Sequence, residues 1–222
     1  MTAIVVATKT GKTLPVFLKS VECYTPADVE VYVAGAEVEI PGRNVVYTEN
    51  HATNFGDSYN AICELAFKKH DRLVVCNDDI VLTPTSYEKL IEDHDFLQKD
   101  YKVGWVAAKC DYARPAQNIR HYKNLKGVRY EEEGLILFCD IVAPILGVIS
   151  KEAWVAYPPI NWLSDDVQCI DILAKGYRNF VSRSYCHHVG SQTVGEDFEK
   201  CWREAEPWIK ANRPDLYGRW YK

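Results

Sequence analysis

Short apolar runs that alternate with amphipathic stretches are the feature that most limits how this chain can fold. Apolar runs this short are typical of buried strands. In the first half of the chain they cover residues 3–7, 29–34, 73–76 and 104–108. In the second half they cover residues 135–139, 145–149 and 178–182.

Helical periodicity separates these predicted strands. The apolar residues within 59–66 fall on one helical face, and Asp57 or Ser58 is the expected N-cap. Thr85 and Glu88 have the spacing of a capping box at the start of a further helix. Strands that alternate with helices predict an α/β fold with a mainly parallel central sheet.

The second half of the chain carries two more helical patterns. Ser164 is the expected cap of a helix that ends at Gly176, a favourable residue just beyond a helix. Residues 196–212 form the other pattern, in which one face carries an apolar stripe. The stripe consists of Phe198, Trp202, Ala205 and Ile209.

Length and charge narrow the class of protein. The 222 residues suffice for one sizeable core and contain no linker, repeat or low-complexity segment, so a single compact domain over residues 1–222 is expected. The formal charge of -5 argues against a nucleic-acid partner, which would need a basic face. No apolar run is long enough for a membrane span.

The eight cysteines indicate the compartment. None has the C-x-x-C spacing of a zinc site, and most lie within apolar runs, as Cys76 and Cys139 do. Such thiols behave as small hydrophobic residues. We therefore expect reduced cysteines in a cytoplasmic protein.

An acidic motif, Asn77-Asp78-Asp79, directly follows the strand predicted over residues 73–76. Ligands of open α/β sheets bind outside the carboxyl ends of the strands. Two adjacent carboxylates at such a place repel each other unless a cation neutralises them, and oxygen ligands suit Mg²⁺ or Mn²⁺. The alternative is a polar turn that caps the next helix.

The acidic motif resembles the D-x-D element of the GT-A glycosyltransferases, particularly of family 2. In that family a proline opens the next helix five positions after the second acidic residue, as Pro84 follows Asp79 here. The resemblance implies that Asp79 is the direct metal ligand. It also implies that Asp78 faces the donor ribose, or the metal through water, and that Asn77 holds the first motif position beside the metal.

Three further segments resemble donor-binding elements of the family. The segment that contains Asn54, Gly56 and Asn60 resembles N-x-G-x-x-x-A-x-N, which lies beside the nucleotide; a turn with a helix cap is the alternative. The end of the first strand, Thr8 and Lys9, corresponds to the corner that holds the base. Gly147 corresponds to a glycine near the donor sugar.

Gly11-Lys12-Thr13 offers a competing interpretation, because it matches the end of a P-loop. The first glycine of that motif is missing, since Val6 occupies its position inside the strand. Leu14-Pro15 is also a poor start for a phosphate-binding helix. We therefore do not predict a P-loop.

Two segments late in the chain resemble the catalytic half of the family. Asp165-Asp166 stands at the place of its acidic pair, where Asp166 would be the general base and Asp165 the preceding acid. Simple charge–dipole capping of a helix is the alternative, and the register leaves Asp165 open as the base. The His187-His188 segment resembles H-x-G-S-x-T, in which a histidine completes the metal site. His188 fits best, and His187 is the alternative because neighbouring strand residues point to opposite faces.

The resemblance implies a Rossmann-like GT-A fold with a nucleotide-binding half (1–108), an acceptor and catalytic half (109–195) and a C-terminal helical segment (196–222). The implied activity is metal-dependent, inverting transfer of a sugar from a UDP-sugar, with UDP-glucose as the first candidate, to an acceptor hydroxyl. Acceptor contacts are expected within residues 111–133. The residues concerned are Tyr112, Arg114, His121, Tyr122, Lys123, Arg129 and Tyr130.

Two other classes stay open. A nucleotidyltransferase would share an acidic metal site, but it would need a Gly-rich, Arg-containing loop after the first strand, where residues 8–11 read Thr-Lys-Thr-Gly. A catalytically inactive, carbohydrate-binding relative is the other. The acceptor and the oligomeric state are not indicated by the sequence.

Overall fold

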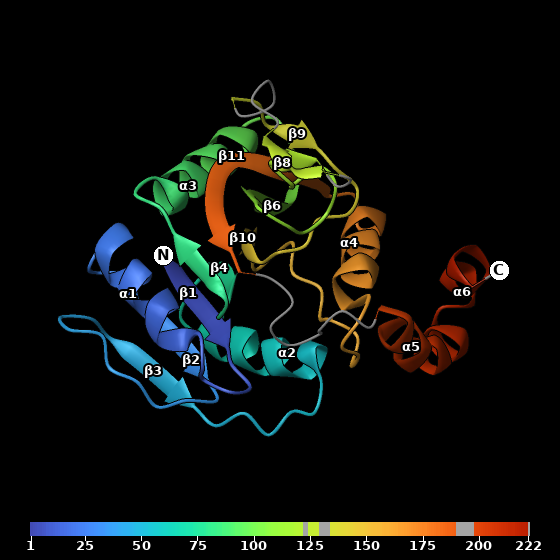
Figure 1. The fold of residues 1–222 in the computed structure, drawn as a ribbon, viewed down its shortest axis with the longest axis horizontal. Coiled ribbons are helices and arrows are strands. Elements are labelled where there is room, and N and C mark those ends of the chain that lie inside the picture. The colour runs from blue at the N-terminus through green and yellow to red at the C-terminus, as the bar shows by residue number, and fades with distance from the viewer. Residues whose placement is uncertain (122–123, 129–133, 190–197, 222) are drawn as a thin grey trace.

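The computed structural model describes residues 1–121, 124–128, 134–189 and 198–221. A nine-stranded sheet forms the centre of the molecule, with strand order β3-β2-β1-β4-β10-β6-β11-β5 and with β9 paired to β11 (Figure 1). Its strands are β1 (Thr2–Ala7), β2 (Val31–Ala34), β3 (Val45–Thr48), β4 (Arg72–Asn77), β5 (Ile80–Leu82), β6 (Val103–Cys110), β9 (Leu137–Phe138), β10 (Leu146–Ser150) and β11 (Arg178–His188). A separate pair consists of β7 (Arg120–His121) and β8 (Asn124–Val128).

The pairing pattern confirms a mainly parallel sheet. Strands β3, β2, β1 and β4 are parallel neighbours, and β6 and β11 form another parallel pair. Strand β10 lies antiparallel between β4 and β6, while β5 and β9 run antiparallel to β11. Six strands therefore share one direction, and their carboxyl ends lie at one edge of the sheet.

Helices cover both faces of this sheet. They are α1 (Leu14–Tyr24), α2 (Phe55–Ala66), α3 (Ser86–Leu97), α4 (Ser164–Ala174), α5 (Phe198–Asn212) and α6 (Pro214–Trp220). Apolar residues of α1 and α3 pack in one core cluster, and those of α2 and α4 pack in a second cluster. A third, smaller cluster joins α5 and α6 to the start of α4. None of the helices in the described ranges is both long and apolar enough to cross a bilayer.

Three of the predicted helix starts differ in detail, and one helix begins where none is predicted. The N-cap of α2 is Asn54, whose side chain accepts the Asp57 backbone N–H, so neither Asp57 nor Ser58 caps it. Thr85 precedes α3 without a side-chain capping bond. Ser164 is the first residue of α4 rather than its cap. Leu14-Pro15 does open a helix, because proline is well suited to a first helical turn.

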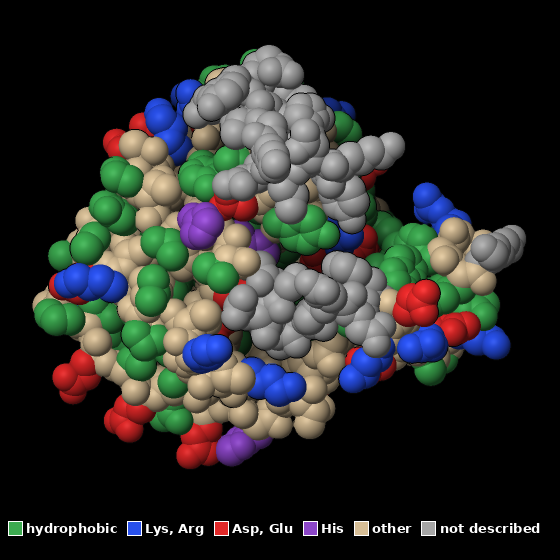
Figure 2. Space-filling model, in the orientation of Figure 1, with side chains coloured by type: hydrophobic (Ala, Val, Ile, Leu, Met, Phe, Trp, Pro, Cys, Tyr) green, Lys and Arg blue, Asp and Glu red, His purple; other side chains and the backbone are tan. Residues whose placement is uncertain are grey.

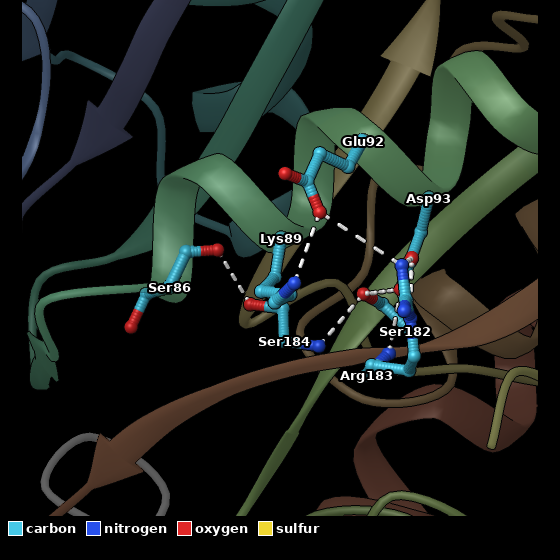
Figure 3. Close-up of polar contacts among 7 residues, drawn as sticks. All are labelled: Ser86, Lys89, Glu92, Asp93, Ser182, Arg183 and Ser184. Atoms are coloured by element: carbon cyan, nitrogen blue, oxygen red, sulfur yellow. Dashed lines mark hydrogen bonds and ion pairs between the residues drawn. The ribbon is translucent and has the colours of Figure 1, made fainter. Parts of the chain in front are cut away.

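A buried polar seam attaches α3 to β11 (Figure 3). The Asp93 carboxylate is fully buried and accepts the Ser182 hydroxyl at 2.7 Å. It also accepts the Arg183 backbone N–H at 2.7 Å, Arg183 Nε at 2.8 Å and the Arg183 Nη2 group. The Ser184 hydroxyl donates to the Ser86 carbonyl at 2.6 Å. The seam therefore fixes the strand that ends at His188.

Candidate functional site

The first corner of the site lies where β1 and β4 end side by side. Ala7 and Asn77 are in register, so the next residues, Thr8 and Asp78, face each other. Thr8 Oγ1 donates to Asp78 Oδ2 at 2.5 Å. Burial raises the pKa of Asp78 and the Asp79 carboxylate adds to this, whereas the bond from Thr8 opposes it. Lys9 is exposed beside this corner.

Asp79 meets His188 at the same edge of the sheet. Strand β5 begins directly after Asp79 and pairs with β11, with Ile80 opposite His188. This pairing brings Asp79 Oδ1 to 3.4 Å from His188 Nε2. Oδ1 is buried and accepts no hydrogen bond in the structure. The fold therefore brings together Asp79 and His188, two of the three residues that the sequence predicts at the metal; Asn77 is the third.

The His188 ring is oriented by its other nitrogen. Nδ1 lies within hydrogen-bond distance of the Tyr112 carbonyl, which can only accept, so Nδ1 carries a proton. In the neutral ring Nε2 therefore presents its lone pair on the side of Asp79. Burial lowers the pKa of His188, but the nearby Asp79 carboxylate, with the Tyr112 carbonyl and Asp111, raises it above the ordinary value overall.

His187, the alternative ligand, makes a different contact. Its Nδ1 lies 2.6 Å from Asp111 Oδ2, and half of its side chain is exposed. The face seen in Figure 2 carries histidine side chains close to acidic ones near its centre. The geometry favours His188 over His187 as the partner of Asp79.

The acidic pair at the start of α4 has a basic partner that the sequence did not indicate. Arg114 Nη2 lies 3.1 Å from Asp165 Oδ2 and also contacts Asp166 Oδ2. Burial and the Asp165 carboxylate raise the pKa of Asp166, and Arg114 opposes this rise. The two carboxylates in turn raise the pKa of Arg114. The sequence predicts Arg114 among the acceptor contacts only, since nothing local links it to α4.

Leu163, directly before this pair, has a strained backbone. Its φ of 66° lies in the left-handed region, which is rare for a residue with a branched side chain. Its side chain is buried with Ile160 and Val167 in the third apolar cluster, and Trp162 packs against that cluster. This packing holds Leu163 in the conformation that starts α4 at Ser164.

The segment predicted to lie beside the nucleotide makes packing contacts in the structure. Asn54 caps α2, and Asn60 binds both backbone groups of Tyr157, at 2.9 Å and 2.8 Å. A Cβ on Gly56 would lie 1.9 Å from the Pro158 carbonyl oxygen, so only glycine fits there. These contacts explain Asn60 and Gly56 without a ligand, and a role of all three toward a nucleotide stays a prediction.

Gly147 lies in β10, between Val75 of β4 and Ala107 of β6. A Cβ at this position would approach Pro144 at 3.0 Å and the Trp105 ring at 3.2 Å. Close packing therefore favours a small residue here, and proximity to a donor sugar stays a prediction. Asn77, the first residue of the acidic motif, ends β4, where its backbone N–H donates to the Ile145 carbonyl at 2.8 Å.

Asp79 and His188 could hold a divalent ion only together with ligands from outside the described residues. Among the residues that the structure describes, no cluster of three or more His, Cys, Asp or Glu side chains could hold an ion. Asp79 and His188 offer two ligand atoms, and Mg²⁺ typically takes one or two protein ligands together with substrate phosphates and water. Two adjacent octahedral ligands about 2.1 Å from one ion are about 3 Å apart. The observed 3.4 Å is close to that separation.

Of the predicted acceptor residues, Tyr122, Lys123, Arg129 and Tyr130 lie outside the described residues. The C-terminal part of the His187-His188 segment, residues 190–193, also lies outside them.

Comparison with known proteins agrees with this architecture: the molecule has the GT-A fold of glycosyltransferases. S. aureus TarS, residues 1–349, superposes with a TM-score of 0.56 at 14% identity over 94% of this chain and 65% of that protein. The same fragment with UDP-GlcNAc gives a TM-score of 0.59 at 13% identity, over 94% of this chain and 66% of the fragment. GalNAc-T7 with UDP, GalNAc and Mn²⁺ gives 0.63 at 13% identity, over 88% of this chain and 44% of that protein.

The chain thus spans less than two thirds of each of these proteins. No family model and no curated protein matches the sequence. At such low identity the likeness establishes the fold, which the sequence predicted.

Proposed function

We propose that this chain is a metal-dependent glycosyltransferase that moves a sugar from a nucleotide-sugar donor to an acceptor hydroxyl with inversion of configuration. The observation that carries the proposal is the Asp79–His188 pair, 3.4 Å apart at the carboxyl edge of the sheet, with a buried carboxylate oxygen that accepts no hydrogen bond. A cation is the partner that such an oxygen lacks. The GT-A fold supplies the context in which that cation would meet a donor diphosphate.

In this proposal the residues at the edge of the sheet bind different parts of the donor. Asp79 and His188 would hold Mn²⁺ or Mg²⁺, which neutralises the charge that develops on the leaving diphosphate. Asn77 would complete the acidic motif beside the ion. Asp78, held by Thr8, would face the ribose from the β1–β4 corner.

The acidic pair supplies the base. Asp166 would take the proton from the acceptor hydroxyl, which attacks the anomeric carbon opposite the diphosphate and so inverts it. Its raised pKa makes it a stronger proton acceptor than an exposed aspartate. Arg114 and Asp165 would position Asp166, Arg114 through a contact with each carboxylate. The nucleotide-binding half would then be residues 1–108 and the catalytic half residues 109–195.

The identity of the donor and the cellular location are also part of the proposal. The compared structures hold UDP, UDP-GlcNAc, GalNAc and Mn²⁺, which supports a UDP-sugar and Mn²⁺, with UDP-glucose as the first donor to test. The five buried cysteines Cys63, Cys76, Cys110, Cys169 and Cys186 are free thiols, which supports a cytoplasmic location.

The test is a panel of UDP-glucose, UDP-GlcNAc and UDP-GalNAc, assayed for UDP release with Mn²⁺ and with EDTA. UDP release that requires Mn²⁺ and is lost in His188→Gln supports the proposal. His187→Gln is the matched control, since this neighbour contacts Asp111 instead of Asp79, and it should keep activity. Pyrophosphate release from a nucleoside triphosphate would instead indicate a nucleotidyltransferase. Donor binding without turnover under any condition would indicate an inactive relative.

A further inference from the structure

Asp111, the first residue after β6, makes contacts that the proposed mechanism has not used. Strands β6 and β11 are parallel, and their register ends at the pair Cys110–Cys186. Beyond that point the Asp111 side chain contacts β11 in place of a backbone carbonyl. Its Oδ2 accepts the His188 backbone N–H at 3.3 Å. A side chain thus extends the contact between the strands by one residue, to the proposed metal ligand.

The same oxygen anchors two further groups of β11. It accepts the Tyr185 hydroxyl at 2.8 Å and lies 2.6 Å from His187 Nδ1. Burial raises the pKa of Asp111, but the bonds from Tyr185 and His188 and the charge of His187 lower it overall. Asp111 is therefore an ionised acceptor that contacts three groups at the end of β11: the Tyr185 hydroxyl, the His187 ring and the His188 backbone N–H.

Tyr112, the next residue, fixes the orientation of the His188 ring at the end of β11. The Tyr112 carbonyl receives His188 Nδ1, so residues 111 and 112 together hold the backbone and the side chain of His188. With Nδ1 occupied, Nε2 is left for the 3.4 Å approach to Asp79. Movement of residue 111 would also shift Tyr112 and its carbonyl, because a planar peptide bond joins the two residues directly.

We propose that Asp111 is a positioning residue of the metal site: through the His188 backbone and the adjoining Tyr112 carbonyl, it sets the place and the tautomer of the His188 imidazole. The proposal deepens the proposed function and depends on it for the ion, but its effect on the His188 ring exists without any ion. Partners of metal-bound histidines typically change metal affinity by about 10–100-fold when they are removed.

The experiment compares Asp111→Ala, Asp111→Asn and Tyr185→Phe with the unmodified chain. Mn²⁺ affinity is measured by electron paramagnetic resonance titration. The His188 tautomer is read in the metal-free protein from imidazole ¹⁵N shifts above the pKa of the ring, and the signals are assigned with His188→Gln. Thermal unfolding shows whether each variant is folded.

We expect Asp111→Ala to weaken Mn²⁺ binding at least about 10-fold and to mix the His188 tautomers. Asp111→Asn keeps an acceptor oxygen, so it should retain most of the Mn²⁺ affinity and most of the preference for one His188 tautomer. Tyr185→Phe removes only one donor of the same oxygen and should keep the affinity within about twofold. Should the alanine variant not fold, Asp111→Ser gives the same readouts, since its hydroxyl is too short to reach all three donors.

Two results would overturn the proposal. One is an alanine variant with the tautomer and Mn²⁺ affinity of the unmodified chain. The other is a Tyr185→Phe loss equal to that of Asp111→Ala, which would mean that any weakening of β11 has the same effect. Absence of Mn²⁺ binding in the unmodified chain contradicts the proposed function alone, because the tautomer measurement still decides the role of Asp111.

Discussion

Replacement of Asp93 by alanine tests whether the polar seam between α3 and β11 stabilises the strand that carries His188. Asp93 is fully buried and accepts four hydrogen bonds, one from Ser182 and three from Arg183 (Figure 3). Removal of one partner of a buried, charged network costs about 3–5 kcal/mol, because the remaining charge and donors lose their acceptor. The guanidinium of Arg183 is about one third exposed and can reach water, so the lower end, about 3 kcal/mol, is expected.

Thermal and urea unfolding measure this loss. In a domain of this size about 1 kcal/mol shifts Tm by about 2–4 °C, so Asp93→Ala should lower Tm by about 6–12 °C. Glu92→Gln is the matched control, since Glu92 lies on the same helix and approaches the same Arg183 at 3.9 Å from the exposed side. Surface pairs contribute about 0–1 kcal/mol, so this control should move Tm by at most about 4 °C. Equal shifts in the two variants would refute the assignment of the stabilisation to the buried carboxylate.

Three further outcomes follow from single residues. Burial, with the nearby Arg72 charge, lowers the pKa of His94 to about 4, so between pH 6.5 and 4 the unfolded chain binds the extra proton. The free energy of unfolding should therefore fall by up to about 3 kcal/mol as pH drops through that window, and urea titrations of His94→Gln should lack this part. Gly56→Ala should lose about 1–3 kcal/mol or more in urea unfolding, because its Cβ would overlap a backbone carbonyl, whereas the exposed control Gly134→Ala should be nearly neutral. Asp166→Asn should abolish sugar transfer to the acceptor, measured as UDP release, while calorimetry shows that donor binding is intact. Full activity of this variant would contradict the role of Asp166 as base.

The central strands could be predicted from continuous apolar runs, because both of their faces are covered. Residues 3–7 and 73–76 became β1 and β4, because runs this apolar are stable only between two covered faces. The strand predicted over 178–182 extends to His188, since its polar second half pairs on both sides with β5 and β6. β3 was not predicted, because it is a half-exposed edge strand and its four residues carry no alternating pattern.

Helix caps were harder to predict than helices. Asp57 and Ser58 are both acceptable N-caps by composition. The chain uses Asn54 instead, because the first turn of α2 is placed by contact with residues near 158: the Gly56 backbone N–H donates to the Ile160 carbonyl at 3.3 Å. A contact between segments so far apart in the chain leaves no trace in a local pattern.

The candidate site shows the same division between local and distant information. Asp79, Asp166 and His188 each lie in a local pattern that marks a strand end or a helix start, so each could be singled out from the sequence. Their partners could not be, because Arg114 lies in a stretch without periodicity and reaches Asp166 only through the turn that its carbonyl makes with residues 117 and 118. Topology decides these pairings: β6 and β11 are parallel neighbours, so the residues that follow β6 must meet the end of β11. The segment that begins at Asp111 therefore reaches His188 at its first residue and the acidic pair of α4 three residues later. Since residues 112 and 114 can lie no more than about 7 Å apart along the chain, the contacts to the proposed ion site and to the proposed base are held by one short stretch of backbone.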